Sequence, residues 1–169
     1  MNIRIATLQD VTMVLELCRK TFYDTWTKFN TDEDINAYMN EFFTEEKVKE
    51  EIQNKEETYL VAFIDEVPSG YVKLRRNYKE GNLGTGKAIE LQRIYVHEHL
   101  QGKGIGQALL DSVIEIARKE KFGVMWLGVW ERNSKAIELY KRYGFGIYDD
   151  HYFTMGNDKS HDWLMRKFL

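Results

Sequence analysis

The spacing of apolar side chains divides the first third of the chain into one short strand and a series of helices. Residues 2–6 predict a strand, and Thr7 with Asp10 forms a capping box for the helix that follows. Apolar side chains then recur at the helical period, at Val11, Val14, Leu15, Cys18 and Phe22. Residues 31–43 repeat this pattern after a Thr/Asp start, and residues 44–54 predict a third, highly charged helix.

From residue 58 the apolar period shortens to that of strands. The run YLVAFI predicts one strand, Asp65 and Glu66 form a turn, and residues 70–74 predict the partner strand of a hairpin. Residues 77–87 contain several glycines and predict a loop, which leads into a strand over residues 88–96. A helix begins near Gly104, and its buried stripe consists of Ile105, Leu109, Val113, Ile116 and Ala117.

The C-terminal part predicts alternating elements: a strand at 124–129, a helix at 134–142, and two closing strands around a Gly156–Asn157 turn. The chain contains no internal repeat, no Gly/Ser linker and no low-complexity tract, and its only proline, Pro68, lies between two strand-like runs. We therefore expect a single domain over residues 1–169, of the α+β class.

One segment carries the most specific chemical signal. The sequence QRIYVHEHLQGKGIGQALL, residues 92–110, runs from a strand through a polar link into alternate glycines and an amphipathic helix. Gly102, Gly104 and Gly106 leave their backbone N–H groups open, and the helix start adds partial positive charge. This corner predicts a pyrophosphate site, although such a string taken alone also fits a plain helix entry.

A second block, residues 126–145, supplies the context for the first. Its strand ends at Glu131, Asn133 and Ser134 open a helix, and Gly144 ends that helix. The inner face of the helix consists of Ala136, Ile137 and Tyr140.

Together the two blocks resemble the acetyl-CoA-binding and C-terminal motifs of the GNAT N-acetyltransferase superfamily. The stretches TFYDTW, WLGVWERN and YFTMG are further similar to those of bacterial PaiA-type enzymes, which acetylate spermidine and spermine. The resemblance implies a three-layer domain with a central mixed, mostly antiparallel sheet of about seven strands flanked by helices. It also implies acetyl-CoA as the cosubstrate.

By this resemblance the cofactor contacts the end of the fourth strand, the glycine corner and the last helix. A backbone N–H near the end of that strand would stabilise the oxyanion. The residues implied in cofactor binding are Ile94, Tyr95, Val96, Gln101, Gly102, Lys103, Gly104, Ile105, Gly106, Gln107, Asn133 and Tyr140. For Asn133 the alternative is a simple helix N-cap, worth about 1 kcal/mol.

The chemistry requires a deprotonated amine, because an amine with a pKa near 10.4 is neutral in about one molecule in a thousand at pH 7. Glu90 matches the position of a catalytic glutamate in some relatives, and its alternative is a solvated or salt-bridged strand carboxylate. Tyr140 matches the tyrosine that protonates the leaving thiolate, and its alternative is a core aromatic. Cys18 lies on an apolar stripe without a neighbouring His, so we expect a buried thiol and direct transfer in a ternary complex.

For the acceptor, the run TFYDTW points to Asp24 and Trp26, which could pair with a polycation and stack against its methylene groups. We expect a polyamine, spermidine or spermine. The alternatives are a protein N-terminus, a lysine or another small amine, because the same scaffold serves many acceptors. A CoA-binding regulatory module without turnover is the alternative from another functional class.

Composition narrows the setting. The net charge of -3 comes from interspersed signs, so we expect no nucleic-acid partner. The single cysteine excludes an internal disulfide and favours a reducing, cytoplasmic location; no apolar run is long enough for a membrane span. His97 and His99 lack the spacing of a helical zinc site, so we expect no metal. The closing run HDWLMRKFL is apolar enough for a core strand or for a homodimer interface.

Overall fold

The computed structural model describes residues 1–156 and 158–169, and these residues form one seven-stranded sheet with helices on both faces. The strands are β1 (Asn2–Ile5), β2 (Glu57–Ile64), β3 (Val67–Arg76), β4 (Ala88–Val96), β5 (Val124–Trp130), β6 (Gly146–Met155) and β7 (Asp158–Phe168). The helices are α1 (Val11–Trp26), α2 (Asp32–Phe42), α3 (Glu45–Gln53), α4 (Ile105–Lys119) and α5 (Ser134–Arg142). Short 3-10 turns, η1 (Leu8–Asp10) and η2 (Glu98–Leu100), precede α1 and α4.

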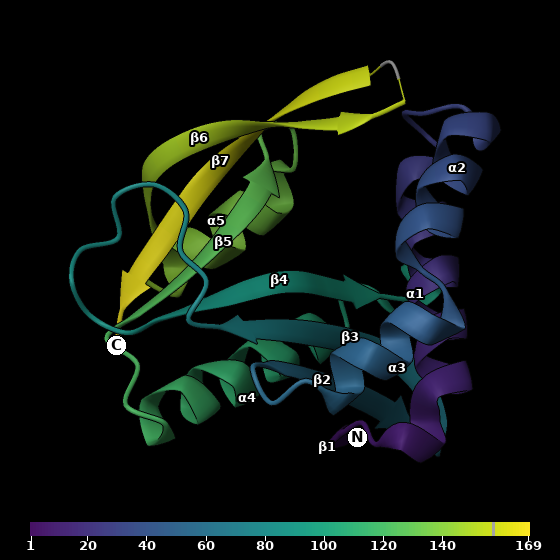
Figure 1. The fold of residues 1–169 in the computed structure, drawn as a ribbon, viewed down its shortest axis with the longest axis horizontal. Coiled ribbons are helices and arrows are strands. Elements are labelled where there is room, and N and C mark those ends of the chain that lie inside the picture. The colour runs from purple at the N-terminus through teal and green to yellow at the C-terminus, as the bar shows by residue number, and fades with distance from the viewer. Residues whose placement is uncertain (157) are drawn as a thin grey trace.

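The sheet is mixed, with strand order β1-β2-β3-β4-β5-β7-β6, and every described pair is antiparallel except β4 with β5. The parallel pairing is short, running only from Ala88 opposite Val124 to Glu90 opposite Trp126. Beyond it β4 stays paired to β3, and β5 stays paired to β7, so the two strands separate (Figure 1). The register of β4 on β3 also shifts by one residue just past this point. The sheet therefore opens in its middle.

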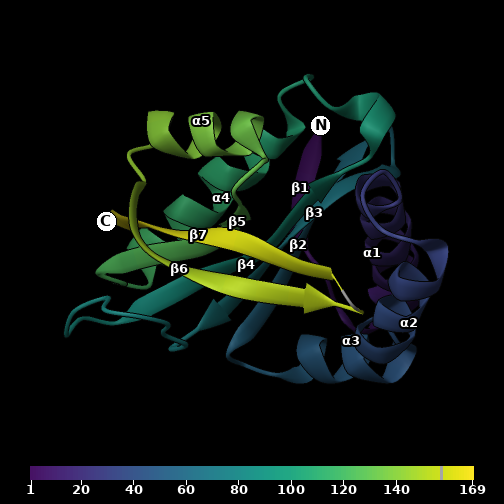
Figure 2. The ribbon, with the colours of Figure 1, turned by 90° about the horizontal axis from the view of Figure 1, so that it is seen from above.

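The strands alternate their side chains between two large buried clusters, one on each face of the sheet, and a smaller third cluster includes Trp126 and Leu164. Val72, Leu74, Ile89 and Leu91 pack with α4, while Tyr59, Val61 and Tyr71 pack with α1 and its neighbours. Figure 2 shows α4 and α5 on one side of the sheet and α1, α2 and α3 on the other. The predicted layers and the mostly antiparallel sheet are thus confirmed.

Several boundaries differ from those predicted. The strand expected at residues 70–74 spans Val67–Arg76 and includes Pro68, which pairs with Phe63 beside an irregularity in the register. The first helix continues to Trp26, so TFYDTW is wholly helical. The turn at Asp65 and Glu66 is present, with φ of 47° and 64°, the left-handed conformation that a tight hairpin turn requires. At the last turn, Asn157 lies outside the described residues.

The far end of the β6–β7 hairpin lies against α2, as Figure 1 shows. The rings of Phe153 and Tyr38 meet edge to face, with centroids 5.6 Å apart. Gly156 has a φ of 58°, which favours glycine, and a Cβ atom there would clash with the Asp34 side chain. This contact connects the C-terminal hairpin to the helical layer that faces it.

None of the helices in the described ranges combines the length and apolar character needed to cross a membrane.

Candidate active site

A cavity of about 980 Å³ opens where β4 and β5 separate. Its wall includes the glycine corner before α4 and the inner face of α5, on one side of the sheet. It also includes side chains of α1, α2 and the β6–β7 hairpin, on the other side. The cavity therefore connects the two faces through the opening in the sheet, an arrangement that lets two substrates meet from opposite sides.

The glycine corner has the conformation that its sequence predicts. Gly102 and Gly104 have φ of 77° and 82°, and Gly104 is the N-cap residue of α4. A Cβ added at Gly102 would meet nothing within 4 Å, so the backbone there faces open space. At Gly106 a Cβ would lie 3.8 Å from Val96, which lets α4 start close against β4. Free amides at a helix N-terminus suit a pyrophosphate, so this corner fits coenzyme A.

The remaining residues of the predicted corner differ in how they reach the cavity. Gln101 and Gln107 lie on its wall, and Gln101 Nε2 donates to the Val96 carbonyl at 3.3 Å. The Ile105 side chain is buried in the core beneath α4, and Lys103 is exposed and lies off the wall. Lys103 and Ile105 could therefore contribute through their backbone amides.

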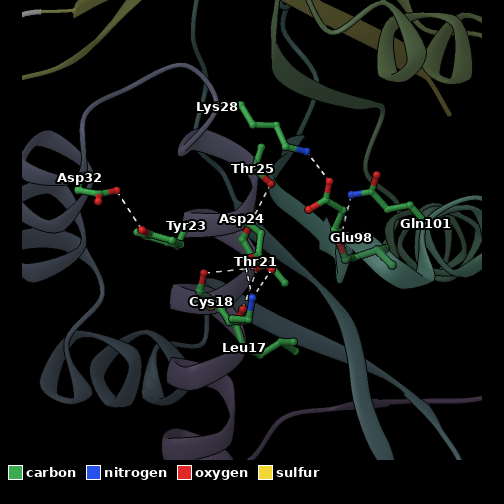
Figure 3. A network of polar contacts seen from close by, with 12 residues as sticks. Leu17, Cys18, Thr21, Tyr23, Asp24, Thr25, Lys28, Asp32, Glu98 and Gln101 are labelled. Carbon is green, nitrogen blue, oxygen red and sulfur yellow. Dashed lines mark hydrogen bonds and ion pairs between the residues drawn. The ribbon is translucent and has the colours of Figure 1, made fainter.

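The link between β4 and α4 is held against α1. Lys28, just past the end of α1, forms an ion pair with Glu98 in the link, close to Gln101 (Figure 3). Both partners are about half exposed, so the pair contributes little free energy, on the order of 1 kcal/mol or less. Its effect is local: it places the helical layer beside the glycine corner.

Tyr140 and Asn133 lie on α5 and both line the cavity. Tyr140 is buried, and burial raises the pKa of its hydroxyl well above the ordinary value. The hydroxyl is therefore protonated at neutral pH and can act as a proton donor. Asn133 Oδ1 accepts a hydrogen bond from the Ala136 N–H at 3.2 Å, which is the N-cap arrangement that the sequence left open as its alternative role.

The end of β4 presents Ile94, Tyr95 and Val96 to the cavity. The Ile94 and Val96 side chains pack toward the α4 core, and Tyr95 points to the other face. The Tyr95 hydroxyl accepts a hydrogen bond from Trp26 Nε1 at 3.3 Å, and burial raises the pKa of Tyr95 to about 12. This bond fixes Trp26, one of the two predicted acceptor residues, on the cavity wall.

Asp24, the other predicted acceptor residue, does not reach the cavity. Its carboxylate forms an ion pair with Lys20 one turn earlier on α1, at 2.5 Å, and Asp24 is absent from the cavity wall. Nearby Cys18 is fully buried, and desolvation raises the pKa of its thiol to about 11. The expectation of a buried thiol is therefore confirmed. A protonated thiol inside the core is a poor nucleophile.

Glu90 lies at the last position of β4 that pairs with β5, on the cavity wall, and is 7% exposed. Arg75 Nε donates to Glu90 Oε2 at 2.6 Å. Desolvation nevertheless outweighs the guanidinium and raises the pKa of the carboxyl above its ordinary value. The side chain is thus both a salt-bridged strand carboxylate and a buried, more basic carboxylate facing the cavity.

Sequence reasoning missed a second polar group on the same wall. His151 Nδ1 lies 2.5 Å from Glu80 Oε1, and His151 Nε2 lies 3.5 Å from Asp162 Oδ2. The three residues come from the loop after β3, from β6 and from β7, so no local motif links them. Only strand pairing reveals them, because β6 and β7 place His151 opposite Asp162.

Within the described residues, no group of three or more His, Cys, Asp or Glu side chains is suited to hold a metal ion.

Comparison with known proteins identifies the architecture. Residues 15–145 match the model of the acetyltransferase (GNAT) family. The chain belongs to this family. A GNAT acetyltransferase takes its acetyl group from acetyl-CoA, and the glycine corner described above has the free amides and the open space that the cofactor's pyrophosphate needs. The protein is an acetyl-CoA-dependent N-acetyltransferase.

Individual relatives cover nearly the whole chain. An uncharacterised N-acetyltransferase of Lactobacillus delbrueckii subsp. lactis is 30% identical over 95% of this chain and 93% of its own length. The spermidine N(1)-acetyltransferase of Thermoplasma acidophilum is 27% identical over 93% and 92% of the two chains. The crystal structure of the PaiA N-acetyltransferase from Thermoplasma acidophilum, in complex with coenzyme A, has a TM-score of 0.78 at 26% identity and covers both chains completely.

Replacing Gly104 with Ala tests the glycine corner. A residue with a Cβ costs about 1–2 kcal/mol in the left-handed conformation, so Gly104→Ala should turn the amides away from the pyrophosphate. We expect the Kd for coenzyme A, measured by calorimetry, to rise about tenfold, which corresponds to about 1.4 kcal/mol. Gly86→Ala is the matched control, because that glycine lies in open space and its φ is not positive. An equal effect of both substitutions would contradict the assignment.

Proposed function

We propose that the protein transfers the acetyl group of acetyl-CoA to a primary amine of a polyamine, by direct attack in a ternary complex. The observation that carries this proposal is the acceptor side of the cavity, where Glu80, Glu90 and Asp162 share a wall with aromatic rings. Carboxylates pair with ammonium groups, and aromatic faces attract cations and cover methylene groups. The resemblance to a spermidine N(1)-acetyltransferase supports the same acceptor class.

In this proposal the cofactor lies along the opening in the sheet. The amides around Gly102 and Gly104 hold its pyrophosphate, and the backbone at Ile94 to Val96 lies along its pantetheine arm. The bound cofactor supplies a thioester carbonyl. A backbone N–H of β4 in the same segment donates to the carbonyl oxygen as negative charge develops there.

Glu90 acts as the proton acceptor for the amine, directly or through water. Its desolvation raises the pKa and makes the carboxylate a stronger base than a solvated one. Arg75 holds one carboxylate oxygen at 2.6 Å, which fixes the orientation of the group. Desolvation of the incoming ammonium within the same cavity lowers the cost of removing its proton.

Tyr140 donates a proton to the departing thiolate from the other side of the opening. Its raised pKa keeps the hydroxyl protonated at neutral pH, so a proton is available to the sulfur as the C–S bond breaks and negative charge develops there. Direct transfer is consistent with Cys18, the only cysteine of the chain, which is buried and protonated and cannot carry the acetyl group.

A panel of acceptors tests the proposed substrate class. We expect thiol release from acetyl-CoA with spermidine and spermine, and little with a lysine-bearing peptide or a peptide with a free N-terminus at matched concentration. The measurement is steady-state kcat/KM for each acceptor. Turnover with a peptide alone would leave acetyl transfer in place and remove the polyamine.

Tyr140→Phe should lower kcat by about ten- to ten-thousand-fold, the usual range for loss of an acid–base group. The Kd for coenzyme A should change little, because the ring that lines the cavity remains. Tyr143→Phe, one turn further along the chain and off the cavity wall, is the matched control. Full activity of Tyr140→Phe would exclude the hydroxyl as the acid.

Glu90→Gln should lower kcat/KM for spermidine and flatten its pH profile. In the unmodified protein the raised pKa means that the reactive carboxylate is lost as the pH falls through that pKa, so activity should decline on the acid side. The amide cannot titrate, so this acid limb should disappear from kcat/KM measured against pH. If the acid limb persists unchanged in Glu90→Gln, another group is the base.

A further inference from the structure

The acceptor side of the cavity contains a histidine held between two carboxylates. His151 lies opposite Asp162 on neighbouring strands, and its two ring nitrogens face Asp162 and Glu80 at 3.5 and 2.5 Å. All three side chains line the cavity and remain partly exposed: Glu80 by 33%, His151 by 31% and Asp162 by 18%. The group is therefore open to a ligand and is not sealed in the core.

The neighbouring strand leaves room beside this group. Gly128 on β5 faces it, and a Cβ there would lie 3.6 Å from His151 Nε2 and 3.7 Å from Asp162 Oδ2. The missing side chain thus keeps the approach to the imidazole clear. Trp126 and Trp130, two residues away on either side, point to the same face by the period of a strand and also line the cavity. An alkyl chain crossing Gly128 would lie between two aromatic rings.

The two carboxylates that face His151 favour a cation at this position, and Arg93, which also lines the cavity, donates instead to the Tyr59 hydroxyl at 3.2 Å. The positive charge of Arg75 already has partners: the side chain donates to Glu90, and its guanidinium lies 3.5 Å from the centre of the Tyr78 ring. Glu80 and Asp162 have His151 as their shared partner in the contacts described above. An imidazole between two carboxylates occupies the position that a small cation with several N–H donors would take.

We propose that Glu80 and Asp162 bind a second ammonium group of the acceptor, and that His151 occupies this position until the acceptor replaces it. The inference rests on the proposed function, because it takes the amine near Glu90 as the one that reacts. It assigns selectivity to residues outside the catalytic machinery: an acceptor with two cationic centres gains the second site, and a monoamine does not. His151 sets how readily that site becomes free.

The test compares an acceptor that carries several ammonium groups with one that carries a single ammonium group. Butylamine has the carbon chain of putrescine with one amine, and spermidine extends putrescine by a further aminopropyl group. In Glu80→Gln and Asp162→Asn we expect the KM for spermidine to rise about tenfold or more, from the loss of a charge-assisted hydrogen bond. The ratio of kcat/KM for spermidine to that for butylamine should fall by a similar factor. In His151→Asn we expect a lower KM for spermidine with unchanged kcat, because the carboxylates lose their internal partner.

A binding measurement separates recognition from chemistry. Calorimetry of spermidine with the protein saturated with coenzyme A should show weaker binding in Glu80→Gln and Asp162→Asn, and tighter binding in His151→Asn. Glu115→Gln, an exposed carboxylate on α4 paired with Lys119, is the charge-matched control. Thermal melts of each variant check that the fold is retained.

The outcomes distinguish this inference from the proposed function. Equal losses for butylamine and spermidine, or a large fall in kcat with unchanged KM in His151→Asn, would overturn the second-ammonium site; the latter would make His151 a proton carrier. If the unmodified protein acetylates spermidine while the variants keep its selectivity, only the second site fails. If no amine is acetylated, the proposed function fails, and unchanged spermidine binding in the variants would then remove the site as well.

Discussion

The short parallel pairing between β4 and β5 is the constraint on which the rest of the structure depends. Each strand pairs over a longer stretch with its other neighbour, β4 with β3 and β5 with β7. The two strands can therefore separate after Glu90 and Trp126 while both stay in the sheet. Backbone groups at the parting edges no longer pair with one another and become available to a ligand. An opening in the middle of a sheet is costly in a protein without a ligand, and here it forms the centre of the candidate active site.

The cavity lining differs in chemical character between the two faces of the sheet. On the α4 and α5 side, glycines and helix amides provide partial positive charge and free space for the phosphates of coenzyme A. On the α1 and α2 side, the wall combines carboxylates with aromatic rings, a composition that suits the proposed cationic acceptor. In the proposed reaction, this difference between the two faces would keep each substrate on its own side, so that the two meet only at the gap.

Burial raises the pKa of titratable side chains along the gap. Desolvation raises the pKa of Glu90, Tyr95 and Tyr140 alike. For the carboxyl this strengthens a base, and for the tyrosines it secures the proton on the hydroxyl. A single physical cause, the burial of these side chains, therefore prepares both the proton acceptor and the proton donor that the proposed reaction needs.

The sequence by itself determined the elements and the cofactor corner, because these depend on local periodicity, on capping residues and on glycines that only local backbone geometry requires. Gly102, Gly104 and Tyr140 were predicted in this way, with the family resemblance choosing Tyr140 among the aromatic residues of α5, and all three lie on the cavity wall. On the proposed acceptor side, Trp26 and Glu90 were named from the sequence, but the group around His151 was brought together by tertiary structure alone. Asp24 turned to Lys20 on its own helix, whereas Glu80, His151 and Asp162 meet only because β6 and β7 pair in one register and a long loop folds beside them. Contacts between residues so far apart in the chain leave no periodic pattern in the sequence. The alternation within a strand shows which of its residues share a face, but it does not show which strand lies beside it.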